Sequence, residues 1–174
     1  MSVPPPVAPP DDAARRAWIG LGGNVGDVAA TFASARTALE ATAGVRVVND
    51  SRLYRTPAWG VTDQPDFINA VLELRTTLAP LALLDRLQAI ERAHGRDRAR
   101  EQRWGPRTLD LDLLAFNDVV LDTPALQLPH PRLAERAFVL VPWAEIAPDL
   151  ALPGLGRIAD LRDALDRSGI EAIP

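Results

Sequence analysis

The sequence predicts a domain built of both helices and strands (α/β in the broad sense, α+β in the strict one). We expect a ferredoxin-like antiparallel sheet covered by helices. Short segments with alternating apolar residues and longer segments with helical periodicity follow in the order strand, helix, strand, strand, helix, strand. At 174 residues, 47% of them hydrophobic, the chain can bury one continuous core. We expect a single domain over residues 17–174 after a disordered leader, residues 1–16, with five prolines in its first ten positions.

Composition excludes several kinds of chemistry. There is no cysteine, so disulfides, thiolate nucleophiles and zinc–cysteine sites are excluded. There is no lysine, so a Walker-type phosphate loop and Schiff-base catalysis are excluded as well. The net charge of −4 argues against nonspecific nucleic-acid binding, and no apolar run approaches the roughly 20 residues of a membrane span. We expect a cytoplasmic monomer that binds small molecules, with neither nucleic acid nor membrane as partner.

The first strand is expected to begin at Trp18 and to lead through a glycine turn into a helix capped by Asp27. The helix has one apolar stripe and stops near Gly44. The pattern G-x-G-x-x-G, counted from Gly20, would require glycine where Val25 stands. We therefore interpret these glycines as a tight strand-to-helix turn, with a phosphate site as the weaker alternative.

Two further strands are expected at residues 45–55 and at about 66–75, separated by a loop that Pro57 and Gly60 open. The later strand has an apolar face, and its opposite face begins with Phe67 and Asn69. A ring and a carboxamide two residues apart can stack on a ligand and read its edge. From this strand alone, however, a core phenylalanine beside a turn-capping asparagine is the favoured interpretation.

The second helix is expected at residues 80–94, with Gln88 and Glu91 on one face. Such a pair is usually solvated. A hairpin turn at residues 117–118 should follow the central strand and lead into residues 119–121. Residues 133–147 are expected to be helical at least in part, and a short helix is expected near residues 161–167.

The densest chemistry lies between Arg92 and Arg107, where six arginines and two acidic residues give a charge of +4. Directly afterwards, residues 109–113 alternate leucine and aspartate, which places Asp110 and Asp112 on one face of a strand. Paired carboxylates suit Mg²⁺, and arginine forks suit phosphates. Each feature alone is usually a solvated surface or a chance motif. Their adjacency, with Trp104 between turn residues, favours a site for a metal-bound polyphosphate.

Residues 103–112, Arg-Trp-Gly-Pro-Arg-Thr-Leu-Asp-Leu-Asp, closely resemble the signature of the 6-hydroxymethyl-7,8-dihydropterin pyrophosphokinases. These folate-pathway enzymes transfer diphosphate from ATP to a pterin alcohol and release AMP. The resemblance runs from Trp18 to about Leu150 and implies a three-layer αβα form of the fold. It also implies that Asp110 and Asp112 hold two Mg²⁺ ions across the phosphates of ATP.

The same resemblance implies three overlapping groups of site residues. The catalytic residues would be Arg103, Arg107, Asp110 and Asp112. ATP would be bound by Gln88, Glu91, Arg96, Arg98, Arg103, Trp104, Arg107, Leu113, His130 and Arg136, with Arg100 as an alternative to Arg98. The pterin would lie between Phe67 and Phe138, with Thr56 and Asn69 at its edge and Pro57, Trp59 and Trp104 lining the pocket. The sequence offers no convincing general base.

Two other functions are open at this point. A different Mg-dependent nucleotide phosphotransferase on the same scaffold would release ADP or pyrophosphate instead of AMP. A ferredoxin-like RNA-binding module would use the arginine-rich loop and Trp104. The second alternative gives no reason for Asp110 and Asp112, whose negative charge would repel RNA.

Overall fold

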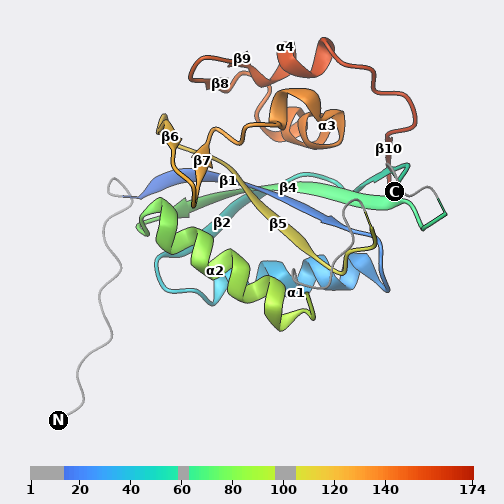
Figure 1. Ribbon diagram of the computed structural model, residues 1–174, viewed down its shortest axis with the longest axis horizontal. Helices are drawn as coiled ribbons and strands as arrows, with labels where there is room; N and C mark the ends of the chain where they lie inside the picture. The colour runs from blue at the N-terminus through green and yellow to red at the C-terminus, as the bar shows by residue number, and fades with distance from the viewer. Residues whose placement is uncertain (1–13, 59–62, 97–104) are drawn as a thin grey trace.

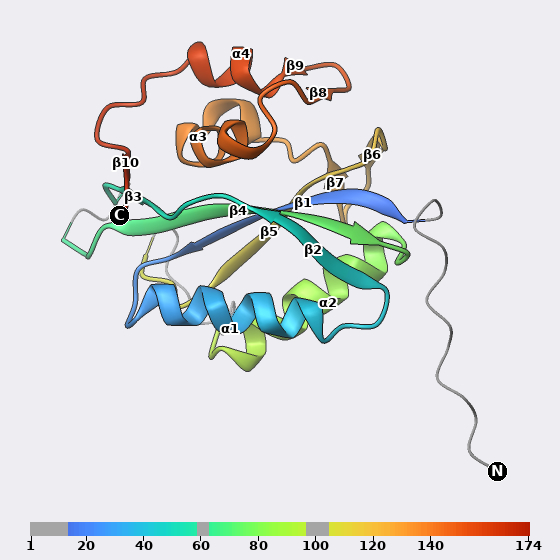
Figure 2. The same cartoon turned by 180° about the vertical axis from the view of Figure 1, so that it is seen from behind.

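A computed structural model describes residues 14–58, 63–96 and 105–174. The central layer is a six-stranded antiparallel sheet. Helices α1 (Val28–Glu40) and α2 (Pro80–Ala93) cover one face, and α3 (Ala137–Ile146) and α4 (Ile158–Asp163) cover the other (Figures 1 and 2). In the described part of the chain, no helix is long and apolar enough to cross a membrane.

The strands of the main sheet are β1 (Arg15–Gly23), β2 (Val45–Asp50), β3 (Tyr54–Thr56), β4 (Phe67–Thr76), β5 (Asp110–Phe116) and β10 (Glu171–Ala172). Two small hairpins, β6 (Leu121–Asp122) with β7 (Gln127–Leu128) and β8 (Ala151–Leu152) with β9 (Gly156–Arg157), and the 3-10 helix η2 (Leu133–Glu135) complete the fold. The sheet order is β10-β3-β4-β1-β5, and β2 also pairs with β4. With β2 and β3 counted as one interrupted strand, this is the ferredoxin-like order, so the predicted fold class is confirmed.

The first strand is longer at both ends than the sequence indicated. It begins at Arg15, so residues 15 and 16, which the sequence assigned to the leader, belong to the strand. Arg16 is held in the strand by a 2.7 Å ion pair between its Nε and Oε1 of Glu73 on β4. The predicted position of the glycine turn was also wrong. Gly20, Gly22 and Gly23 belong to β1, and the chain bends into α1 only after them.

The predicted strand over residues 45–55 is interrupted because side chains replace ladder partners. The hydroxyl of Ser51 accepts the N–H of Val71, and the N–H of Arg52 donates to Glu145 on α3. The hairpin turn at Asn117 is present, with a φ of 48°, but the strand after it pairs with β7 and not with β5. The last helix is α4, which begins and ends earlier than the predicted residues 161–167.

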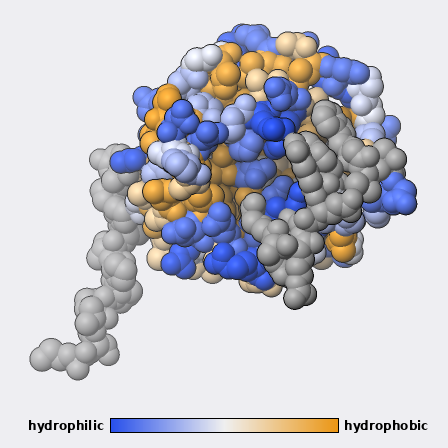
Figure 3. All heavy atoms as spheres, viewed as in Figure 1, coloured by the Kyte–Doolittle hydropathy of each residue, from blue (hydrophilic) through white to orange (hydrophobic). Residues whose placement is uncertain are grey.

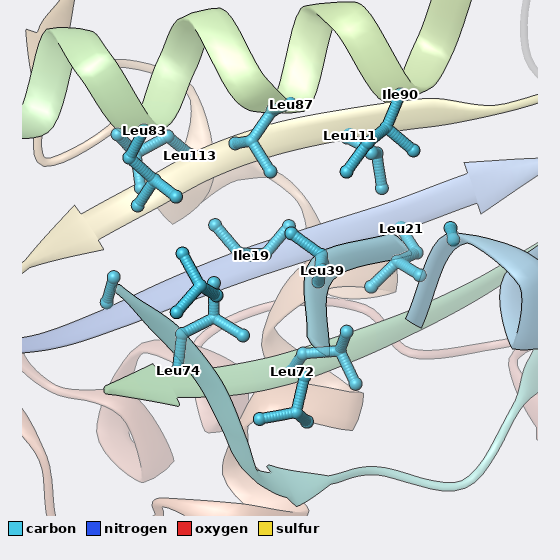
Figure 4. Close-up of a cluster of buried hydrophobic side chains, with 14 of the residues drawn as sticks. Ile19, Leu21, Leu39, Leu72, Leu74, Leu83, Leu87, Ile90, Leu111 and Leu113 are labelled. Carbon is cyan, nitrogen blue, oxygen red and sulfur yellow. The ribbon is translucent and has the colours of Figure 1, made fainter. Parts of the chain in front are cut away.

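The core between the sheet and helices α1 and α2 contains mostly aliphatic side chains (Figure 4). Leu83 and Leu87 of α2 point toward Leu111 and Leu113 of β5, and Leu39 comes from α1. The apolar stripe of α2 therefore packs against the leucine face of β5, and the sequence predicted both of these faces.

A second core lies between the sheet and the α3–α4 layer, with Trp18 and Trp143 as its largest members. Their ring centroids are 5.9 Å apart. The register of β1 against β5 shifts at Trp18 and Ile19, so Leu114 and Ala115 of β5 both pack in this second core. On the α3 side of β5, Leu114 and Ala115 therefore pack in this core, whereas Asp110 and Asp112 line a cavity.

Candidate active site

A cavity of about 140 Å³ lies between the sheet and the first turn of α3, several times the volume of roughly 30 Å³ that one water molecule occupies. Its walls are Gly20, Leu21, Gly22, Thr56, Pro57, Phe67, Asn69, Ala70, Arg107, Asp110, Asp112, Arg136, Phe138 and Val139. Hydrophilic side chains gather near the centre of the molecular face shown in Figure 3, with hydrophobic surface around them. The cavity therefore combines acidic, basic and aromatic groups.

The two aspartates of β5 lie on the cavity side of the strand, as the alternation predicted. In the register with β1, Asp110 pairs with Gly22 and Asp112 pairs with Gly20. Their neighbour Leu111 packs in the opposite core. The side chains of Asp110 and Asp112 keep 30% and 29% of their surface exposed, so each is largely buried but still partly open to a ligand.

The two carboxylates of this pair repel each other, which changes the pKa of Asp112. The pKa of Asp112 is raised to about 7, first because burial removes water from the carboxylate and second because Asp110 lies beside it. Arg136 acts in the opposite direction, with its Nη1 3.8 Å from Oδ2 of Asp112. A cation between the carboxylates would relieve this repulsion.

The donor set fits a magnesium ion that binds together with a phosphorylated substrate. Among the described residues, no group of three or more His, Cys, Asp or Glu side chains could hold a metal. A cation here would therefore take two protein carboxylates and complete its shell with water and phosphate oxygens, which is how Mg²⁺ is commonly bound. The oxygens are hard ligands, which disfavours a soft metal.

Glu91 and Arg96 form a buried network under β5. Oε2 of Glu91 accepts from the backbone N–H of Leu111 at 2.8 Å and from Nη1 of Arg96 at 2.5 Å. Nη1 of Arg96 also contacts Oδ1 of Asp110 at 2.5 Å. The network connects α2 to β5 and holds the first aspartate from below. The structure thus gives Glu91 and Arg96, both expected at ATP, a clear set of protein partners.

Thr56 and Asn69 meet where β3 pairs with β4. Nδ2 of Asn69 donates to the hydroxyl of Thr56 at 2.9 Å, and both residues are buried in the cavity wall. Phe67 is the register partner of Thr56, and Phe138 reaches the cavity from the first turn of α3. The structure therefore brings together the described residues expected to stack on a pterin and to read its edge.

Other predicted residues lie elsewhere. Trp59, Arg98, Arg100, Arg103 and Trp104 are outside the described residues. The side chain of Leu113 packs in the core between the sheet and helices α1 and α2 (Figure 4). Gln88 is half-buried on α2. Among the described residues, Gln88, Glu91, Arg96, Leu113 and His130 do not line the cavity.

His130 lies beside β5, where its backbone N–H donates to the carbonyl oxygen of Leu114 at 2.8 Å. Burial lowers the pKa of His130 to about 4, and the nearby Arg136 lowers it too. The ring is therefore neutral at pH 7. Its Nδ1 accepts the N–H of Arg132 at 3.2 Å, so the proton of the neutral ring is on Nε2, which can donate a hydrogen bond.

Sequence reasoning missed the role of Gly20 and Gly22 in the cavity wall. A Cβ atom on Gly22 would lie 3.1 Å from Oδ1 of Asn69, closer than an ordinary contact. The glycines therefore leave the room that the asparagine and the cavity need. Glycines two residues apart in a strand were a usable signal, because glycine inside a strand often marks the close approach of a ligand.

Asn24 was also missed. It is 5% exposed, its Oδ1 accepts the backbone N–H of Arg107, and its Nδ2 donates to Gln64 and to the carbonyl oxygen of Pro65. Its own backbone N–H donates to the carbonyl oxygen of Arg107 at 2.9 Å. Asn24 therefore fixes the backbone that presents Arg107 to the cavity. Nothing in the sequence distinguishes it from a solvated turn asparagine.

Comparison with known proteins is consistent with this geometry. A family model described as 7,8-dihydro-6-hydroxymethylpterin-pyrophosphokinase matches residues 18–148. A protein of Methylorubrum extorquens described as 2-amino-4-hydroxy-6-hydroxymethyldihydropteridine pyrophosphokinase is 50% identical over 158 residues, 91% of this chain and 98% of that protein. A protein of the same description from Pseudomonas aeruginosa is 46% identical over 160 residues, 92% of this chain and 98% of that protein.

The fold also matches solved structures. The crystal structure of Plasmodium falciparum HPPK-DHPS wild type with pteroate has a TM-score of 0.70 and 15% identity, and the match covers 87% of this chain. The chain spans 42% of the length of that solved chain. At this identity the likeness supports the fold alone.

Proposed function

This chain belongs to the 7,8-dihydro-6-hydroxymethylpterin-pyrophosphokinase family, and from that premise we propose that the cavity under α3 is its active site. The chain is a pyrophosphokinase of folate biosynthesis. It transfers diphosphate from ATP to the hydroxymethyl group of 6-hydroxymethyl-7,8-dihydropterin and releases AMP. The proposal assigns this reaction to particular residues.

The pterin ring binds at the β3–β4 side of the cavity. Phe67 and Phe138 stack on its two faces, because both line the cavity and come from opposite walls, the sheet and α3. Thr56 and Asn69 hydrogen-bond to the polar edge of the ring, since their side chains are buried there and can both donate and accept. Pro57 forms the rim beside them.

The triphosphate of ATP binds at the β5 side, where the charged residues lie. Arg107 and Arg136 line this end and bind phosphate oxygens through their guanidinium groups. The first turn of α3 faces the same space, and its partial positive charge favours anions. We assign His130 a supporting hydrogen bond from Nε2, and we keep Arg98, Arg103 and Trp104 as proposed ATP contacts from outside the described residues.

Asp110 and Asp112 would hold two Mg²⁺ ions together with the phosphates. When bound, the ions supply neutralisation of polyphosphate charge and make the substrate alcohol more acidic. The chain's own groups orient the reactants: the stacked pterin presents its hydroxymethyl oxygen toward the phosphates that the arginines hold. That oxygen loses its proton to water and forms a bond to the β-phosphorus, the bond from this phosphorus to the α,β-bridging oxygen breaks, and AMP leaves with the bridging oxygen. Arg103 and Arg107 stabilise the developing charge.

One observation carries the proposal: the two carboxylates of β5 and the Thr56–Asn69 pair of β3 and β4 line the same cavity. The test is to incubate the protein with ATP, Mg²⁺ and the pterin alcohol and to identify the nucleotide product. Pterin-dependent AMP is expected. ADP or pyrophosphate would indicate a different phosphotransferase on this scaffold and would overturn the assignment.

Asp112→Asn tests the role of the carboxylates. It should lower kcat by at least about 100-fold, because charge stabilisation by groups at the reacting centre contributes at that scale. Thermal unfolding should stay near that of the parent protein, since the substitution removes a repulsion with Asp110. Asp118→Asn, in an exposed turn after the same strand, is the matched control and should keep full activity. Turnover near the parent rate in Asp112→Asn would remove the metal argument.

A further inference from the structure

The C-terminal segment, residues 165–174, lies beyond the region that the family model matches, which ends at residue 148. It nevertheless packs against the strand that leads into the proposed pterin site. β10 pairs antiparallel with β3, with Glu171 opposite Arg55 and Ala172 opposite Tyr54. The N–H of Ile173 donates to the carbonyl oxygen of Leu53 at 2.8 Å. Figure 2 shows β10 beside β3 at the end of the chain.

Without β10, β3 would be the edge of the sheet at this point. It has three residues and its other side pairs with β4. A strand this short on an edge has few bonds to hold its backbone, so its position depends strongly on each neighbour. Thr56, the last residue of β3, accepts the hydrogen bond from Asn69. The segment therefore supports the backbone on which that pair depends.

A second contact reaches the cavity rim itself. Residues 167–170 form a turn in which the N–H of Ile170 donates to the carbonyl oxygen of Arg167 at 3.2 Å and Gly169 has a φ of +80°. A Cβ atom on Gly169 would lie 3.1 Å from Cγ and 3.3 Å from Cδ of Pro57. The turn thus lies directly against the ring of Pro57, which lines the cavity.

The phosphate side of the cavity has a separate support. Asp110 and Asp112 are on β5, and β4 and β1 lie between β5 and β3 in the sheet. β5 is held by β1 and, through Glu91 and Arg96, by α2. A disturbance at β10 would therefore act on the pterin side and leave the ATP side in place.

We propose that residues 165–174 position Thr56 and Pro57 for the pterin, and so set the affinity of the enzyme for the pterin and not for ATP. The proposal rests on the pterin pocket assigned above. It gives the C-terminal segment, in particular Gly169 and the β10 pairing, the role of a positioning element. A purely structural role would instead lower stability and affect both substrates equally.

Two variants test the proposal by steady-state kinetics with each substrate varied in turn. The first is the chain ending at Ser168, which lacks β10 and the contact with Pro57. The second is Gly169→Ala, which keeps β10 and alters the contact. In both, KM for the pterin should rise roughly tenfold, the scale of losing about one well-made hydrogen bond or its equivalent in packing. KM for ATP and kcat should stay within about twofold.

Gly154→Ala is the matched control for Gly169→Ala. Gly154 has a φ of +72°, so alanine suffers a similar backbone strain there, but a Cβ atom meets nothing within 4 Å. This variant should lose similar stability and keep the parent KM for the pterin. In a Pro57→Ala background, Gly169→Ala should raise KM for the pterin less than it does in the parent protein, because the opposing ring is gone.

The outcomes separate this inference from the assignment of the pocket. Asn69→Ala, measured alongside, tests the pocket and should raise KM for the pterin. If Asn69→Ala has this effect while Gly169→Ala and the shortened chain leave KM for the pterin unchanged, or change both KM values equally, the positioning role is wrong. If Asn69→Ala also has no effect, the pocket itself is misassigned. If the shortened chain fails to fold, Gly169→Ala and its control decide the question alone.

Discussion

The charged residues around β5 are of two kinds: some are partly exposed in the cavity, and others are buried on the opposite side of the strand in hydrogen bonds and ion pairs. Asp110 and Asp112 keep nearly a third of their side-chain surface exposed, whereas the side chain of Glu91 is 2% exposed and that of Arg96 is 5% exposed. Glu91 accepts from the backbone of β5 and from Arg96. Its position on a helix face beside Gln88 could be predicted from sequence. Its hydrogen-bond partners could not be predicted, because Arg96 and Leu111 lie outside the helix, 5 and 20 residues further along the chain.

Glu91→Ala should destabilise the protein by about 3–5 kcal/mol, because it leaves the buried N–H of Leu111 without its acceptor and removes one of the carboxylates that pair with the buried Arg96. Glu91→Gln keeps an oxygen for Leu111 and should be less destabilising. Urea unfolding measures both. If Glu91 instead acts mainly as an ATP ligand, as the family resemblance implied, Glu91→Gln would raise KM for ATP severalfold with little change in the free energy of unfolding.

At the scale of elements, β1 does more than join two neighbours. Its glycines shape the cavity wall, and the two that face Asp112 and Asp110 differ in what surrounds them. A Cβ atom on Gly22 would lie 3.1 Å from Oδ1 of Asn69, whereas on Gly20 its nearest neighbours would be the side-chain atoms of Leu114, at 3.4 Å and beyond. The strand thus offers a matched pair of sites on one face.

Gly22→Ala should therefore raise KM for the pterin, by roughly tenfold, because the added methyl group displaces the carboxamide of Asn69 from its bond to Thr56. Gly20→Ala should have an effect of less than about threefold, since an ordinary contact can be absorbed by a small rotation of Leu114. Steady-state kinetics with varied pterin compares the two. Equal effects would mean that the asparagine is not the group displaced.

The alternation over residues 109–113 correctly placed two carboxylates on one face and leucines on the other, because burial on one side of a strand leaves a clear two-residue pattern. The break between β2 and β3 was missed because the hydroxyl of Ser51 replaces a backbone partner, which no periodicity records. The pairing of β10 with β3 joins residues more than 100 positions apart, so local pattern gives no sign of it.

The whole molecule is a sheet with a separate core on each face. β1, β4 and β5 contribute side chains to both: Ile19 and Leu72 to the core under α1 and α2, Trp18 and Val71 to the core under α3. The order of elements along the chain predicted the ferredoxin-like sheet and its helices, whereas the third layer, with α3 and α4, was implied only by the family resemblance. The active-site cavity lies on the α3 side of the sheet. The strand that carries its carboxylates is also held from the α2 side, by Glu91 and Arg96.

Because alternate residues of the same strands belong to the two cores, neither layer should unfold without the other. Leu87→Ala in the first core and Leu140→Ala in the second, both fully buried, should each destabilise the protein by about 2–5 kcal/mol. Urea unfolding followed by circular dichroism should shift to lower concentration as one transition in each variant. Amide exchange under native conditions should then show α2 and α3 losing protection together in both variants. If Leu140→Ala released α3 while α2 kept the protection of the parent protein, the α3 layer would be an independent unit, and Arg136 and Phe138 would be held in the active site by ligand and not by the fold.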